Sequence, residues 1–188
     1  MKVYSYVVDH DVGREPNPYF GVCTLCRCKF SKKAEATHGL KGRRNIVELA
    51  EPGDWVIGTG GESKKSAGNG KLIYAMKVDE KLPREKYYND PRFANKKPER
   101  PLSDFQKHCQ FALVSRHFYY FGAKAIPIPE RFKHFEKKGP GFRYVDPDEF
   151  GPFLEWLKKL NPQGKHVEPC YQETVDKPKG SGRCNSSC

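Results

Sequence analysis

The sequence contains no long apolar run. None of its segments approaches the roughly 20 consecutive apolar residues that a membrane-spanning helix requires. The N-terminus does not resemble a secretory leader, because Met1 is followed at once by a strand-like stretch that ends in Asp9, His10 and Asp11. We therefore expect no membrane partner, and we predict a cytoplasmic protein.

The seven cysteines do not follow the pattern of a disulfide-stapled secreted domain. Their number is odd, and Cys23, Cys26 and Cys28 lie too close together to staple such a scaffold. A closed zinc site needs four ligands, and no second pair of Cys or His stands at matching spacing; only the distant His38 or Cys109 could be recruited. We expect reduced thiols, no metal and no cofactor.

Signatures of common catalytic sites are missing as well. The motifs G-x-S-x-G and H-E-x-x-H do not occur. Residues 58–60 begin like a dinucleotide-binding fingerprint, but Ser63 replaces its third glycine and no helix is expected to follow. His108 and Cys109 are neighbours, and the side chains of neighbouring residues diverge on a strand. The sequence therefore nominates no catalytic residue.

Acidic residues are few relative to basic ones. The chain carries 34 Lys and Arg against 23 Asp and Glu, a formal net charge of +11 that is spread along its length. Such an excess favours polyanionic partners, above all nucleic acids. The alternative is a merely soluble basic protein, because charge alone does not identify a partner.

Hydrophobic periodicity predicts an α+β fold. Strands are expected over residues 2–9, 54–59, 71–79 and 111–122, and an extended segment over 125–129. The second and third strands should form a hairpin around the glycine-rich loop 60–70. Short helices are expected over 45–50 and 83–88. A longer helix begins at Asp146-Pro147, with its buried face formed by Phe150, Phe153, Leu154, Leu157 and Leu160.

We expect these elements to form a single domain over residues 1–162. Its sheet should be curved, mostly antiparallel or mixed, and flanked by short helices. Residues 163–188 are expected to form a disordered or loosely attached tail, because Gly, Pro, Ser and Lys replace the hydrophobic periodicity there. The sequence contains no signal for an oligomeric state.

Four blocks resemble the second of the families called nucleotide modification associated domains, found in phages and bacteria. They are Pro16-Asn17-Pro18 with 21–29, residues 53–60, residues 71–76 with 87–93, and residues 113–129, and they span about residues 1–130. This resemblance implies a nucleotide or nucleic-acid context. The block Gly53-Asp54-Trp55 is similar to the Gly-Asp turn of PUA-like barrels that read modified bases, which implies a PUA-like open barrel as one form of the sheet.

The resemblance implies a polar pocket floor where Cys23, Thr24 and Lys29 converge near Trp55 and Thr59. Ordinary turn packing, and a core position for the tryptophan, are the alternatives. Aromatic rings stack on bases while Lys and Arg neutralise phosphates. The predicted nucleotide-binding residues are Asn17, Cys23, Thr24, Lys29, Asp54, Trp55, Thr59, His117 and Tyr119, and the predicted phosphate contacts are Arg43, Arg44, Lys64, Lys65, Arg92 and Lys97.

The leading hypothesis is a module that binds a nucleotide or nucleic acid and recognises a modified or flipped base. The alternative is an enzyme that processes or builds a modified nucleotide, with Cys23, Lys29, Asp54 or His117 in acid-base or nucleophilic roles. A third hypothesis is a small interaction protein in phage conflict, which a large exposed apolar patch would favour. A nucleophile, a base and an orienting group within hydrogen-bond reach would favour the enzyme.

Overall fold

The computed structural model describes residues 1–26, 30–34, 43–96, 110–139, 141–160 and 168–170, with the side chains of 30–34 and 43–44 outside that description. The strands are β1 (Val3–Val8), β2 (Cys23–Leu25), β3 (Phe30–Ala34), β4 (Arg43–Asn45), β5 (Trp55–Gly60), β6 (Lys71–Lys77), β7 (Glu80–Pro83), β8 (Phe111–Ser115), β9 (Phe118–Tyr120), β10 (Ile126–Pro127) and β11 (Phe142–Val145). The α-helices are α1 (Ile46–Leu49), α2 (Arg84–Asn89) and α4 (Pro147–Leu160), and the 3-10 helices are η1 (Pro91–Lys96), η2 (Gly122–Lys124) and η3 (Glu130–Phe135).

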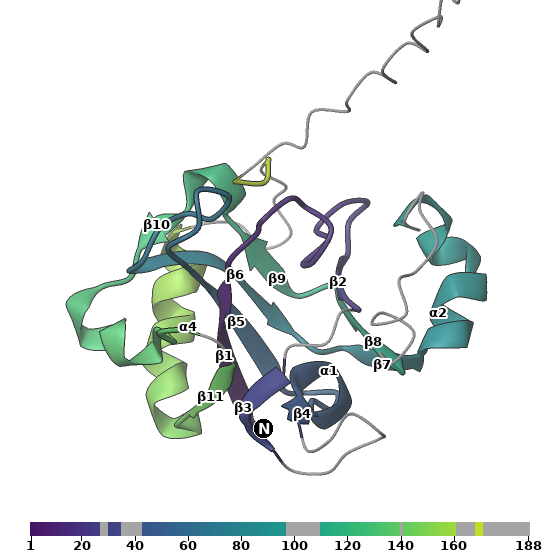
Figure 1. Ribbon diagram of the computed structural model, residues 1–188, viewed down its shortest axis with the longest axis horizontal. Coiled ribbons are helices and arrows are strands. Elements are labelled where there is room, and N and C mark those ends of the chain that lie inside the picture. The colour runs from purple at the N-terminus through teal and green to yellow at the C-terminus, as the bar shows by residue number, and fades with distance from the viewer. Residues whose placement is uncertain (27–29, 35–42, 97–109, 140, 161–167, 171–188) are drawn as a thin grey trace, which may run out of the picture.

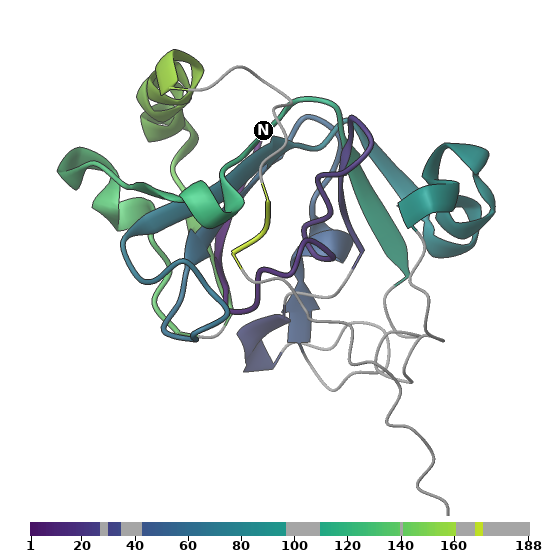
Figure 2. The same ribbon diagram turned by 90° about the horizontal axis from the view of Figure 1, so that it is seen from above.

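The elements stack in layers (Figure 1, Figure 2). The helix α4 covers one face of a large sheet, and the opposite face of that sheet packs against a small sheet and α1. The outer face of the small sheet is covered by α2 and η1 through Tyr87 and Phe93. One continuous core therefore lies between the two sheets, with a second core under α4.

The large sheet has the strand order β10-β6-β5-β1-β11, with β9 also paired to β6. Its pairs are antiparallel except for β1 and β5, which run parallel with Val3 opposite Trp55. The small sheet has the order β2-β8-β7, and β3 pairs with β4 apart from both sheets. The predicted α+β class with a mixed sheet is confirmed; within the described residues the large sheet ends at β11 and does not close into a barrel.

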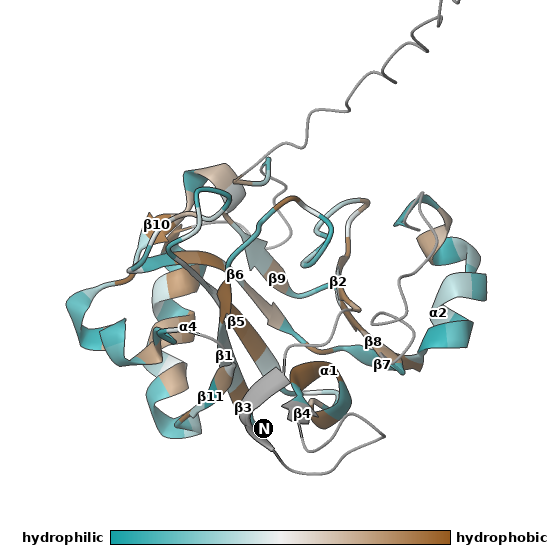
Figure 3. Ribbon diagram, viewed as in Figure 1, coloured by the Kyte–Doolittle hydropathy of each residue, from teal (hydrophilic) through white to brown (hydrophobic). Residues whose placement is uncertain are grey.

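The alternation in β1, whose strand the sequence predicts, divides its side chains between the two cores. Tyr4, Tyr6 and Val8 point into the core between the sheets, whereas Val3 points toward α4. Figure 3 shows the apolar segments concentrated in the strands, while the loop between β5 and β6 and the outer helix α2 are largely hydrophilic. Successive side chains of a strand point to opposite faces, so the alternation in the sequence shows which residues of β1 share a face.

The chain passes between the two sheets at two places, and the strand predicted over 111–122 is divided at one of them. The strand β6 continues into β7 around Asp79, and β8 continues into β9 through Arg116 and His117. The amide of Lys77 donates to the carbonyl of His117, so the two crossings lie side by side. Alternation does not reveal such a break, because the residues on both sides have the same strand propensity.

The helix α4 begins as the sequence predicts. The Asp146 side chain accepts a hydrogen bond from the amide of Asp148 at 3.0 Å, which caps the helix start. Phe150, Phe153 and Leu157 are buried, but Leu160 at the last position is 48 % exposed. The buried face therefore ends one turn earlier than predicted.

Within the described segments, no helix has the length and apolarity needed to cross a lipid bilayer. Of the predicted tail, residues 163–167 and 171–188 lie outside the described residues. The three residues between them are held against η2 and Asp11, because the amide of Ala123 donates to the carbonyl of Glu168 at 2.8 Å and the amide of Cys170 donates to the Asp11 carboxylate at 3.0 Å.

Candidate functional site

Polar side chains gather in the core between the two sheets. We call them the seam cluster, which consists of Tyr6, Asp11, Glu15, Cys23, Tyr74 and Lys96. All are buried except Glu15, which is half-buried. The hydroxyl of Tyr74 donates to that of Tyr6 at 2.8 Å. Polar groups in a core cost free energy unless they are paired, so a cluster of this kind marks a candidate functional site.

Lys96 connects the seam cluster to the chain segment above it. Its Nζ donates to the carbonyl and to the side-chain Oδ1 of Asn17 at 2.9 and 3.0 Å, and to the carbonyl of Val22 at 2.8 Å. Burial lowers the pKa of Lys96 to about 8, although the neighbouring Cys23, Cys26 and Glu15 act in the opposite direction. All three ammonium donors are used within the protein, so Lys96 is a clamp and not a surface cation.

The two carboxylates of the seam cluster are bound by neutral donors. Asp11 accepts from the hydroxyl of Tyr120 at 2.7 Å and from the amide of Cys170. Glu15 accepts from the amide of Cys26 at 2.7 Å. Burial raises the pKa of Tyr6, and the Glu15 carboxylate adds to this rise. The phenols of the cluster are therefore neutral donors and acceptors at physiological pH.

The thiols near the seam cluster are poor nucleophiles. Burial raises the pKa of Cys23 to about 12, with Glu15 and Asp11 adding to the rise and Lys96 opposing it. Burial also raises the pKa of Cys26 well above its ordinary value. Because the thiolate is the reactive form, neither group has the electrostatic environment of a catalytic cysteine.

A turn over residues 17–24 forms the solvent side of this region. Asn17 and Thr24 close it with two backbone hydrogen bonds of 2.9 and 3.0 Å. Phe20 stands in this turn with a φ of 59°, a left-handed conformation that bulky residues rarely adopt. Its ring is beside that of Tyr19 and is 65 % exposed. We call this segment the Phe20 turn.

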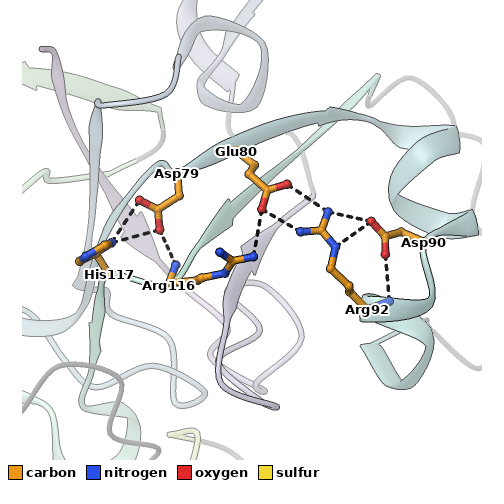
Figure 4. A network of polar contacts seen from close by, with 6 residues as sticks. All are labelled: Asp79, Glu80, Asp90, Arg92, Arg116 and His117. Atoms are coloured by element: carbon orange, nitrogen blue, oxygen red, sulfur yellow. Dashed lines mark hydrogen bonds and ion pairs between the residues drawn. The ribbon is translucent and has the colours of Figure 1, made fainter.

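A second polar group lies at the crossings between the sheets (Figure 4). The Asp79 carboxylate accepts from the amide of Arg116 at 2.6 Å and lies 3.2 Å from Nδ1 of His117. The His117 side chain is 53 % exposed. A base and an orienting carboxylate therefore stand together on the surface.

The same network neutralises Arg92, one of the predicted phosphate contacts. Its guanidinium binds the Glu80 carboxylate through two hydrogen bonds and the Asp90 carboxylate through two more (Figure 4). Arg116 lies 3.6 Å from Glu80 as well. A phosphate would have to compete with two carboxylates for Arg92.

The comparison with family models identifies the family. The model described as nucleotide modification associated domain 2 matches residues 1–111 and 102–177. The chain belongs to this family. The resemblance carried by the four sequence blocks is confirmed, and the match continues past them through α4. No curated protein and no solved structure matches the chain.

Two of the predicted nucleotide-binding residues, Cys23 and Asn17, lie at the seam, whereas Thr24 faces the outer side of the small sheet. Cys23 belongs to the core between the sheets, and Asn17 is held by Lys96. The hydroxyl of Thr24 accepts from that of Tyr87 at 3.2 Å. Lys29, predicted to join them, lies outside the described residues.

Four others are engaged elsewhere. Trp55 is 6 % exposed and packs against Phe150, with ring centroids 5.1 Å apart, and Tyr119 belongs to the same core under α4. Asp54 accepts from the amides of Lys2 and Glu51, which fixes the turn before β5. The hydroxyl of Thr59 donates to the carbonyl of Tyr6. The structure therefore does not bring these four together with the polar groups of the seam.

The remaining predictions concern phosphate and metal. Lys64 and Lys65 lie in the loop between β5 and β6; Lys97 and the side chains of Arg43 and Arg44 lie outside the described residues. Among the described residues, no group of three or more His, Cys, Asp or Glu side chains is arranged to hold a metal ion.

Sequence reasoning missed most of the seam cluster. A signal existed for Tyr6 and Tyr74, because a phenol at a strand position that points inward needs a hydrogen-bond partner. Lys96 stands in a basic connector, where no local pattern distinguishes a buried lysine from solvated ones. Asp11 follows a strand end, which is also an ordinary place for an exposed carboxylate.

Proposed function

We propose that the protein binds a nucleotide or a nucleic-acid strand by stacking a base on Phe20. The family context of nucleotide modification supports a base as the ligand. The net charge of +11 supports a phosphorylated one. The observation that carries the proposal is the Phe20 ring, which is 65 % exposed on a backbone with a φ of 59°.

Neither backbone conformation nor core packing explains a phenylalanine at this position. A left-handed conformation costs an L-residue about 1–2 kcal/mol, a cost that glycine avoids. An exposed ring gains little from burial. A strained residue with an exposed aromatic side chain is accounted for by a binding role, since every base offers a π-face on which such a ring can stack.

The Phe20 turn is held in place before any ligand arrives. Lys96 binds the carbonyls of Asn17 and Val22, at the two ends of the segment that carries the ring. Gly13 makes room for Tyr19, because a Cβ at Gly13 would lie 2.7 Å from the Tyr19 hydroxyl. A preorganised turn loses less conformational entropy on binding. The half-buried amide of Asn17 lies in the same turn, where it can read a base edge.

The substitution Phe20→Gly tests the proposal, because it removes the ring while relieving the backbone strain. We expect a loss of about 1–3 kcal/mol in the free energy of binding to a modified or unmodified nucleotide panel. We expect the free energy of unfolding to change by less than about 1 kcal/mol, since glycine favours this φ. Titration calorimetry and urea unfolding measure the two effects. Phe20→Trp should retain binding.

Tyr144→Ala provides a matched control, because Tyr144 is another exposed ring, 49 % accessible, on β11. Its loss should leave the affinity per folded molecule unchanged. Equal affinities for wild-type protein and Phe20→Gly would refute the stacking role. Loss of binding in Tyr119→Phe alone would instead place the nucleotide on the α4 side, where the predicted residues Trp55 and Tyr119 lie.

A second candidate function is general-base catalysis on a modified nucleotide. The Asp79 carboxylate, 3.2 Å from Nδ1 of His117, supports it because this geometry orients the ring and leaves Nε2 to accept a proton from an attacking water. His117→Gln and Asp79→Asn should then each abolish turnover while binding remains. Unchanged turnover in both variants would show that the pair only joins the two crossings.

A further inference from the structure

Four exposed lysines lie on separate segments at the β10 end of the large sheet. We call them the lysine edge, which consists of Lys64, Lys71, Lys124 and Lys138. Lys71 begins β6 and pairs with Pro127 of β10, and Lys124 ends η2, just before β10. The loop before β6, the short strand β10 and η2 occupy the same region in Figure 1 and Figure 2.

Backbone contacts bring the fourth segment to the same edge. The Glu136 carboxylate accepts from the amide of Gly70, and the amide of Ile128 donates to the carbonyl of Gly70 at 2.8 Å. Lys138 follows Glu136 by two positions, so it stands near the start of β6. The segments that carry the four lysines are therefore brought to one region by tertiary contacts, although they extend over residues 64–138.

Ion pairs do not neutralise the lysine edge within the part of the chain that the structure describes. Among the described residues none of the four lysines makes an ion pair, whereas Lys81 binds Glu51, Arg92 binds Glu80 and Lys158 binds Glu155 on other surfaces. The four ammonium groups outnumber the carboxylates of Glu62 and Glu136 in the same segments. Uncompensated lysines at one edge create a positive field that favours a polyanion.

A chain of contacts leads from the lysine edge to the Phe20 turn. The amide of Asp11 donates to the carbonyl of Lys65 at 2.9 Å, which joins the lysine loop to the seam cluster. Gly13, two positions after Asp11, lies against the Tyr19 ring, because a Cβ at Gly13 would be 2.7 Å from the Tyr19 hydroxyl. The residue after Tyr19 is Phe20. The loop that carries Lys64 is therefore connected to the Phe20 turn by contacts around Asp11.

We propose that the lysine edge binds the phosphate backbone of a nucleic-acid strand that continues to the Phe20 turn. The stacking of a base on Phe20 rests on the proposed function, and the lysine edge adds that the ligand is a polynucleotide. A free nucleotide carries its phosphates as one short group attached to a single ribose, so its phosphates stay close to its base. A strand presents one phosphate per nucleotide and can contact the lysines in succession.

The experiment compares wild-type protein with a variant in which Lys64, Lys71, Lys124 and Lys138 are all changed to Gln. The probes are a mixed-sequence single-stranded oligonucleotide and a mononucleotide, titrated by fluorescence anisotropy and calorimetry over a range of salt concentrations. We expect the oligonucleotide affinity to fall about tenfold or more at low salt, and the slope of log K against log salt to flatten by about two to three. Mononucleotide affinity should not change.

A matched variant separates local from general charge effects. Changing Lys2, Lys86, Lys158 and Lys159 to Gln removes the same charge from other exposed positions, and should leave the salt slope close to that of wild-type protein. An equal effect of both variants would overturn the proposal, as would an unchanged slope in the lysine-edge variant or no binding of the oligonucleotide by wild-type protein. Melting curves confirm that each variant is folded.

The outcomes also separate this inference from the proposed function. If Phe20→Gly binds normally but the lysine-edge variant does not, the base contact is wrong and the phosphate surface stands. If only Phe20→Gly loses binding, the lysine edge is overturned while the base contact stands. Anionic lipid vesicles serve as a competitor, and competition as strong as that of the oligonucleotide would identify a membrane and overturn the assignment to nucleic acid.

Discussion

Lys96 and Asn17 are 79 positions apart in the sequence and are joined twice, by hydrogen bonds from Nζ to the carbonyl oxygen and to Oδ1 at 2.9 and 3.0 Å. The third bond of Lys96, to the carbonyl of Val22, closes the other side of the same turn. The position of Phe20 therefore depends on η1, an element of the outer helical layer.

Lys96→Met should loosen the Phe20 turn. The substitution leaves the oxygens of Asn17 and Val22 without their donor, and a buried acceptor that loses its partner costs about 1–3 kcal/mol. We expect a lower free energy of unfolding and a weaker affinity for nucleotide, measured by urea unfolding and calorimetry. Lys86→Met on the exposed side of α2 is the control and should change neither. A variant as stable as wild-type protein would contradict the clamp.

The stability contributed by Lys96 should depend on pH with a defined sign. Burial lowers the pKa of Lys96 to about 8 from an ordinary value of 10.5, so between these pH values the unfolded chain binds more protons than the folded one. Stability relative to Lys96→Met should therefore rise with pH across this window, by up to about 1.4 kcal/mol per pH unit. Parallel unfolding curves of the two proteins, which share all other titrating groups, measure the difference. A fall in this difference would contradict the lowered pKa.

The thiols of Cys23 and Cys26 should resist alkylation in the folded protein. A pKa raised by burial from 9.0 to about 12 lowers the thiolate fraction of Cys23 about a thousandfold near neutral pH. Iodoacetamide labelling followed by peptide mapping should show slow modification of both residues in buffer and rapid modification in urea. Rapid labelling of native Cys23 would revive the hypothesis of an enzyme with a cysteine nucleophile.

Trp55→Ala should act on stability and not on binding. The Trp55 ring packs against Phe150 in the core under α4, and removal of a buried tryptophan costs about 3–5 kcal/mol. Urea unfolding measures this loss, and nucleotide affinity per folded molecule should be unchanged. Trp156→Ala, at a partly buried position of the same cluster, should cost less. Weakened binding without a loss of stability would place Trp55 in the site, as the sequence predicted.

The sequence by itself determined the α+β class, the hairpin of β5 and β6, the two faces of β1 and the capped start of α4. These features depend on local properties: side-chain alternation, turn residues and a capping carboxylate within a few positions of the helix. The family also followed from short blocks of sequence, whose combination the family model confirms.

Only the tertiary structure decided where the strand over 111–122 changes sheet and which polar residues meet at the seam. The aromatic residues Trp55 and Phe20 each stand within two positions of a glycine, yet the first is 6 % and the second 65 % exposed. Lys96 and the four lysines of the lysine edge are the same residue type, yet Lys96 is buried and the other four are exposed. What separates them is the set of contacts with residues far away in the sequence, because burial and charge pairing depend on distance in space and not on position along the chain.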